Sequence, residues 1–119
     1  MSGRLTTHVL DLSKGLPAKE IKVELWHIES ERSRNLLKTV HTNSDGRVDS
    51  PLLEGEEVTI GEYELLFYAG DYLKAQGISI SNPPFLDCVP IRFGIADCNR
   101  HYHIPLLVAP GGYSTYRGS

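Results

Sequence analysis

The sequence has few of the features that define several common classes of protein. Only two of its 119 residues are cysteine, and Cys88 and Cys98 form no Cys-x-x-Cys pattern. They therefore indicate neither a disulfide framework nor a zinc knuckle, and we expect two reduced thiols. No segment approaches the roughly 20 consecutive apolar residues of a membrane-spanning helix. Positive charge is also scarce: the net charge is -3 and the pI is about 5.9, which argues against nucleic-acid or anionic-membrane partners.

Motifs for several kinds of chemistry are missing as well. The sequence contains no Gly-rich phosphate loop, no nucleophile elbow and no Cys–His signature. Its first residues lack the apolar segment of a secretory signal. We therefore expect a cytoplasmic protein, with a peroxisomal or a periplasmic location as the open alternatives. A length of 119 residues with 40% hydrophobic and 23% charged residues predicts one globular domain that spans residues 1–119.

What the sequence does contain is a series of segments whose hydrophobicity alternates with period two, the mark of half-buried β-strands. The alternation is clearest at residues 21–26, 62–67 and 89–95, and shorter candidates are residues 6–11, 36–42, 58–60 and 113–117. Turn-forming residues separate them at 14–17, 43–46, 82–84 and 110–112. Seven or eight short strands predict an all-β protein, an antiparallel sandwich of Greek-key type, with a barrel as the alternative.

One segment is typical of a helix instead. Residues 71–76 are bounded by Asp71, a residue type that caps helix N-termini, and by Gly77, a residue type that ends helices. The sequence therefore predicts one short helix near residues 71–76.

Residues 101–108 form a predicted strand whose two faces differ in chemistry. One face, suited to a core, carries Tyr102, Ile104, Leu106 and Val108, and the other carries His101, His103, Pro105 and Leu107. Both histidines are thus expected to point away from the core, either as ordinary surface residues or as part of a site in a cleft or interface. A neutral imidazole can take a proton from water near pH 7.

A metal site is the third interpretation of this segment. The His101-x-His103 spacing places two imidazoles on one face, as in some zinc sites. Because no carboxylate or cysteine stands at a matching spacing, we expect no metal.

Two further residues are candidates for a site. His8 lies in the first predicted strand, where its neighbours on the same face would be Thr6 and Leu10. Arg47 follows the turn residues Asp45-Gly46 and is expected to begin a strand. Taken alone, each residue is more often structural or solvated than functional. His27 and His41 are expected to be structural, and the acidic residues around Gly55 are expected to form a solvated face.

The chain ends in Tyr116-Arg117-Gly118-Ser119, directly after a segment that is typical of a strand. Chain ends fray unless they are held in place. Two tyrosines and an arginine within the last seven residues indicate a docked end. Docking would fix the terminal carboxylate, the Ser119 hydroxyl and the Arg117 guanidinium in space, so this end is a candidate part of a site.

Four segments together resemble the 5-hydroxyisourate hydrolases, the transthyretin-related enzymes of purine breakdown. The segments occur in the family's order and spacing over nearly the whole chain: Thr6-Thr7-His8-Val9-Leu10-Asp11, Asp45-Gly46-Arg47, His101-Tyr102-His103-Ile104-Pro105-Leu106-Leu107 and Tyr116-Arg117-Gly118-Ser119. The terminal tetrapeptide is the family's most recognisable signature. The resemblance implies a transthyretin-like (prealbumin-like) sandwich and a homotetramer, a dimer of dimers with its active sites in a channel between dimers.

The same resemblance implies a hydrolase of urate degradation, which converts 5-hydroxyisourate to 2-oxo-4-hydroxy-4-carboxy-5-ureidoimidazoline. It assigns water activation and proton relay to His8 and His103, and substrate binding and charge stabilisation to Arg47. Ser119 would contact the substrate or order the attacking water. The rest of the signature would shape the substrate-binding pocket: Tyr116, Arg117 and Gly118. The resemblance implies neither a metal nor an organic cofactor.

The rival interpretations are binding proteins. Transthyretin itself has the same fold and carries hydrophobic hormones in the same channel. A carrier has no need of His8, Arg47 and His103 around one cavity, and it lacks the terminal tetrapeptide. A plain interaction module of sandwich fold would leave the four matching segments unexplained.

Overall fold

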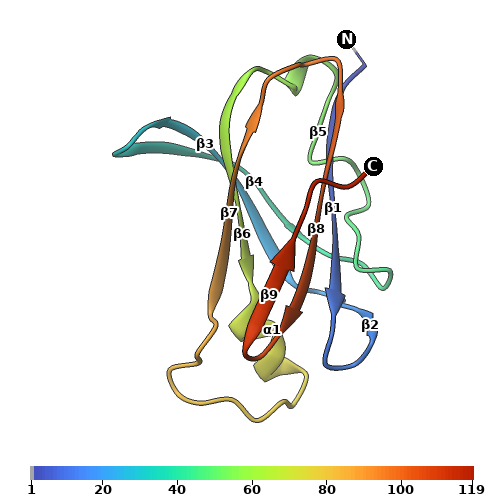
Figure 1. Ribbon diagram of the computed structural model, residues 1–119, viewed down its shortest axis with the longest axis vertical. Helices are drawn as coiled ribbons and strands as arrows, with labels where there is room; N and C mark the ends of the chain where they lie inside the picture. Colours follow the sequence, from blue (N-terminus) through green and yellow to red (C-terminus); the bar gives the residue numbers. More distant parts are fainter. Residues whose placement is uncertain (1) are drawn as a thin grey trace.

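The computed structural model describes residues 2–119, which form two β-sheets packed face to face (Figure 1). The strands are β1 (Arg4–Asp11), β2 (Leu16–Pro17), β3 (Lys22–Ser30), β4 (Ser33–His41), β5 (Leu53–Glu54), β6 (Gly61–Tyr68), β7 (Cys88–Ile95), β8 (His101–Ala109) and β9 (Gly112–Thr115). Sheet A has the order β2-β1-β8-β9, with β5 also paired to β1, and sheet B has the order β4-β3-β6-β7. The β3–β4 hairpin projects away from the sandwich (Figure 1).

The core lies between the two sheets and follows the predicted alternation. In β6 the side chains of Tyr63, Leu65 and Phe67 are at most 2% exposed, and in β8 Leu106 and Val108 are fully buried. Burying one face of each strand in this way removes apolar surface from water, the main favourable contribution to folding. The predicted all-β sandwich with one short helix is therefore confirmed.

Two local expectations were wrong. β1 and β8 are parallel, in register from Arg4 opposite His101 to Asp11 opposite Val108, so the sandwich is not purely antiparallel. No strand forms at residues 58–60, which follow a 3-10 helix (Gly55–Glu57). Alternation within one strand carries no information about the direction of its partner, and a run of three residues is too short for periodicity to be decisive.

The helix α1 (Ala69–Ala75) begins two residues before the predicted start. Its N-cap position is Tyr68, the last residue of β6, so Asp71 lies in the first turn and is not the cap. A carboxylate in the first turn still interacts favourably with the positive end of the helix dipole. Gly77 is confirmed as the stop: it has φ of +76°, and the N–H groups of Gly77 and Ile78 donate to the carbonyls of Lys74 and Leu73, a Schellman motif. Within residues 2–119, no helix is long and apolar enough to cross a membrane.

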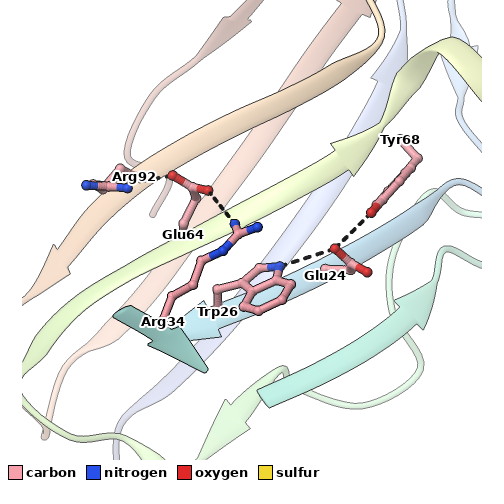
Figure 2. Close-up of polar contacts among 6 residues, drawn as sticks. All are labelled: Glu24, Trp26, Arg34, Glu64, Tyr68 and Arg92. Carbon is pink, nitrogen blue, oxygen red and sulfur yellow. Dashed lines mark hydrogen bonds and ion pairs between the residues drawn. The ribbon is translucent and has the colours of Figure 1, made fainter. Parts of the chain in front are cut away.

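The outer face of sheet B carries charged side chains that pair with one another (Figure 2). Glu64 lies between two arginines, with Arg34 Nη1 at 3.5 Å and Arg92 Nε at 3.3 Å from its oxygens. Glu24 accepts hydrogen bonds from Trp26 Nε1 at 3.2 Å and from the Tyr68 hydroxyl at 2.9 Å. Because both carboxylates already have partners, this face is better suited to stabilising the packing of β3, β4, β6 and β7 than to binding a substrate.

Candidate active site

His8 and His103 come from the two adjacent parallel strands of sheet A. His103 lies opposite Thr6 and His8 lies opposite Pro105, so the two histidines are diagonal neighbours. Both are half-buried on the outer face, while Val9 and Ile104 next to them point into the core. The prediction that His103 points away from the core is confirmed by this burial pattern.

Arg47 reaches the same face from a loop. The Asn43–Gly46 turn is closed by a hydrogen bond from Gly46 N–H to the Asn43 carbonyl at 2.9 Å. Asn43 also holds Arg47, because its Oδ1 accepts the Arg47 N–H at 3.2 Å. Arg47 then forms an isolated antiparallel bridge with His8. The expected strand after Arg47 does not form, and the bridge alone places this residue beside β1.

Gly46 makes the approach of this turn to β1 possible. Its φ is +74°, and a Cβ at this position would lie only 2.4 Å from the carbonyl oxygen of Val9. Its own carbonyl accepts the Val9 N–H at 2.8 Å. A residue with a side chain would therefore push the turn, and Arg47 with it, away from His8.

Burial and the nearby positive charge favour the neutral form of both imidazoles. Burial, and then the Arg47 guanidinium, lower the pKa of His8 below its usual value, against a smaller opposing effect of Asp45. Burial, Arg47 and His8 lower the pKa of His103. Since the neutral imidazole is the form that accepts a proton, the pair is suited to act as a general base near pH 7.

The chain end is docked onto His103, as the sequence suggested. After β9 the chain continues beside β8 in the same antiparallel register, and the Gly118 N–H donates to the His103 carbonyl at 2.7 Å (Figure 1). At the end of β9 itself, the Thr115 hydroxyl donates to the Pro105 carbonyl at 2.7 Å. Ser119 follows as an exposed terminal residue, one position beyond the contact with His103.

Arg117 lies on the other side of sheet A from the histidines. Its guanidinium carbon is 4.4 Å from the centre of the Tyr102 ring, and Tyr102 belongs to the core face of β8. Tyr116 and Arg117 line a cavity of about 280 Å³ that also touches Phe93 and Ile104. The structure therefore brings together His8, Arg47, His103 and Gly118, and it does not bring the Arg117 side chain to them.

Thr6 is a site residue that the sequence did not single out. Its Oγ1 lies 2.8 Å from His103 Nδ1, within hydrogen-bond distance. The alternation in β1 already placed Thr6 on the face of His8. Its contact with His103 depends on the parallel register of β1 and β8, for which the sequence carries no local signal.

The remaining histidines have other surroundings. His101 is exposed, and its Nε2 lies 2.9 Å from the Ser2 carbonyl, while the His27 ring packs against Tyr63 with 5.2 Å between ring centres. Among residues 2–119, no three His, Cys, Asp or Glu side chains are grouped so that they could hold a metal ion.

Known proteins resemble this chain over its whole length. It is 58% identical to 5-hydroxyisourate hydrolase 2 of Rhizobium meliloti (strain 1021), over 99% of this chain and 98% of that protein. It is 55% identical to 5-hydroxyisourate hydrolase of Halalkalibacterium halodurans, with both chains fully covered.

Solved structures agree with these relatives. Klebsiella pneumoniae 5-hydroxyisourate hydrolase matches with a TM-score of 0.82 at 34% identity, with both chains fully covered. An (S)-allantoin synthase matches with a TM-score of 0.93 at 44% identity, but this chain spans only 44% of that longer chain. Sea bream transthyretin in complex with thyroxine matches with a TM-score of 0.86 at 24% identity, which shows a common fold alone.

The sequence pattern of the HIUase/Transthyretin family matches residues 5–118, a range that contains His8, Arg47, His103 and Gly118. With the fold, the full-length relatives and this match in agreement, the chain belongs to the HIUase/Transthyretin family.

Proposed function

We propose that this protein is a hydrolase that converts 5-hydroxyisourate to 2-oxo-4-hydroxy-4-carboxy-5-ureidoimidazoline, as a single domain of residues 1–119. The observation that carries the proposal is the convergence of His8, Arg47 and His103 on one face of sheet A, beside the docked chain end. Full-length relatives named for this activity support the substrate.

The residues divide the chemistry as follows. A neutral imidazole of the His8–His103 pair takes a proton from water as the water oxygen attacks a ring carbonyl. The C–N bond then breaks, and the pair gives the proton to the departing ring nitrogen. The histidines thus return to their starting protonation state after each turnover. Arg47 binds the polar substrate and offsets the negative charge that develops on the carbonyl oxygen.

The signature at the chain end supports this chemistry from two sides. Gly118 lies against His103, and to the next residue, Ser119, we assign contact with the substrate or ordering of the attacking water. Tyr116 and Arg117 line a cavity away from the histidines, so we assign them an indirect role: Arg117 stacks on Tyr102 and thereby holds the terminus beside His103. No residue on this face requires a metal or an organic cofactor for the proposed steps.

The substrate channel is proposed to form in a homotetramer, a dimer of dimers. On the outer face of sheet A, half-exposed Leu10 and Leu107 lie near the histidines, and Leu16 is 58% exposed. Covering these side chains with a second copy would remove apolar surface from water and close the open side of the site. Light scattering after size-exclusion chromatography measures this directly, with a tetramer expected and a monomer at micromolar concentration contradicting it.

The decisive experiment is spectroscopic. Urate oxidase generates 5-hydroxyisourate in place from urate, and its ultraviolet decay is followed with and without this protein. Faster decay is expected, and an unchanged rate would overturn the proposed activity. A carrier of the transthyretin type would leave the decay rate unchanged, so the assay separates the two functions. The cytoplasm is the proposed location, which fractionation of the source cells can test.

A further inference from the structure

We propose that Thr6 is a positioning residue for His103: its hydroxyl accepts a hydrogen bond from Nδ1–H of the ring and so leaves the lone pair on Nε2 for the reaction. The proposal deepens the proposed function and rests on it. It assigns to Thr6 a role that acts through His103, without contact with the substrate.

The first support is the geometry of the contact. Thr6 Oγ1 and His103 Nδ1 are 2.8 Å apart, a good hydrogen-bond length for this pair. The two residues are direct partners in the parallel register of β1 and β8, and both are half-buried on the outer face. A threonine in a strand has few favoured χ1 rotamers. Its hydroxyl is therefore a fixed point for the ring at low entropic cost.

The second support is the packing on the other edge of the ring. A Cβ at Gly118 would lie 2.4 Å from Cδ2 and 3.1 Å from Cγ of His103, so the terminal segment lies directly against this side. Thr6 holds the Nδ1 edge. The ring is thus fixed at two separate points, and Nε2 is the nitrogen that remains for the substrate.

The third support concerns the tautomer. A neutral imidazole has one N–H and one lone pair, and the hydrogen bond made by one nitrogen selects the role of the other. If Nδ1–H donates to Thr6, Nε2 can accept a proton from water. If instead the Thr6 hydroxyl donated to Nδ1, Nε2 would carry hydrogen and could not be the base. The proposal therefore makes a definite statement about which nitrogen carries the proton.

The competing explanation is that the Thr6 hydroxyl only satisfies the hydrogen-bonding needs of a neighbouring polar atom. The adjacent residue, Thr7, provides a control for this explanation. Thr7 follows Thr6 in β1, and on the buried face its hydroxyl donates to the carbonyl of Ile104 in β8 at 2.7 Å. Replacing Thr7 with valine removes a hydroxyl from the same strand pair without touching a histidine. It should lower stability and leave the state of His103 unchanged.

The test combines NMR and kinetics on the intact protein. Nitrogen-15 spectra of histidine-labelled protein are expected to show His103 as the Nδ1–H tautomer in the native chain and as a tautomer mixture in Thr6→Val. In the 5-hydroxyisourate assay, Thr6→Val should lower kcat by about 10- to 100-fold through misorientation of the ring, with KM nearly unchanged. Thr6→Ser keeps the hydroxyl and should recover most of the loss. Thr7→Val should change neither the tautomer nor kcat.

Two results would overturn the proposal: a native His103 that carries its hydrogen on Nε2, or a folded Thr6→Val variant with native kcat and tautomer. Circular dichroism establishes folding for each variant. Failure of the proposed function has a different signature, because the native protein would then not accelerate 5-hydroxyisourate decay. The tautomer measurement needs no substrate and decides the Thr6 contact in either case.

Discussion

Gly118 lies so close to the imidazole ring of His103 that there is no room for a side chain between them. A Cβ at Gly118 would approach Cδ2 of the ring to 2.4 Å. The Gly118 N–H donates to the His103 carbonyl at 2.7 Å, so the chain end cannot retreat without breaking this hydrogen bond. The docked terminus and the histidine therefore form one packed unit.

Gly118→Ala is expected to lower kcat by about 10- to 100-fold, because the added methyl group must displace either the ring or the terminus from its position. The melting temperature should hardly change, since the position is next to the chain end. Gly111→Ala is the matched control, because a Cβ there has no heavy atom within 4 Å. Native turnover by Gly118→Ala would show that the close contact has no part in catalysis.

His103→Ala and His8→Ala are each expected to lower kcat by roughly 100- to 10,000-fold, the usual range for a group in general acid–base catalysis. Similar losses would support a working pair. His41→Ala is the control, an exposed histidine at the end of β4. Steady-state assays with circular dichroism on each variant make the comparison, and full activity in either of the first two removes that histidine from the mechanism.

Arg47→Gln should change the pH at which the histidines titrate. After burial, Arg47 is the next cause that lowers the pKa of both His8 and His103. Its removal should raise both pKa values toward the usual imidazole value, so the acidic limb of the kcat profile moves to higher pH. NMR titration of the free protein checks this without substrate.

The remaining charged neighbours stay in place in Arg47→Gln: Asp45 still raises the pKa of His8, and His8 still lowers the pKa of His103. Arg4→Gln is the control, since Arg4 is not among the groups that shift either histidine. An Arg47→Gln titration that matches the native one would mean that the guanidinium does not act on the pair.

Tyr72→Phe should reduce stability with no effect on catalysis. The Tyr72 hydroxyl donates to the fully buried carboxylate of Asp11 at 2.7 Å. Loss of a hydrogen bond to a buried charged group costs about 1–3 kcal/mol in the free energy of unfolding. Urea denaturation at neutral pH measures this cost, and kcat below the unfolding transition should be native. Tyr113→Phe, at a 43% exposed position, should change neither.

The loss of stability in Tyr72→Phe should depend on pH. Burial acts to raise the pKa of Asp11, but hydrogen bonds from Ser13, Tyr72 and Lys14 outweigh it and lower the pKa. A carboxyl whose pKa is lowered by folding stabilises the protein above its unfolded-state pKa, and this contribution is lost as the pH falls through the folded-state pKa. The stability difference between native protein and Tyr72→Phe should therefore shrink in acid. A difference that stays constant into strong acid would contradict this role of Asp11.

Local patterns in the sequence predicted most of the strands because each strand buries one face, and burial leaves a period-two record in the residues themselves. Gly77 was predictable for a similar reason, since few residues other than glycine adopt its backbone conformation easily. The start of α1 was not predictable, because β6 runs directly into the helix and makes Tyr68 the N-cap position in place of Asp71.

For the candidate site, the sequence by itself determined the chemical groups, which four short segments supply, and the face of the strand on which His103 lies. Only the tertiary structure decided which of these groups meet. The parallel register of β1 and β8 places Thr6 on His103. The antiparallel pairing of the terminal segment with β8 puts Gly118 against the ring, while Arg117 lies over Tyr102 on the opposite face. The physical reason is that alternation depends only on a strand's own residues, whereas strand direction and register depend on pairing with other segments of the chain.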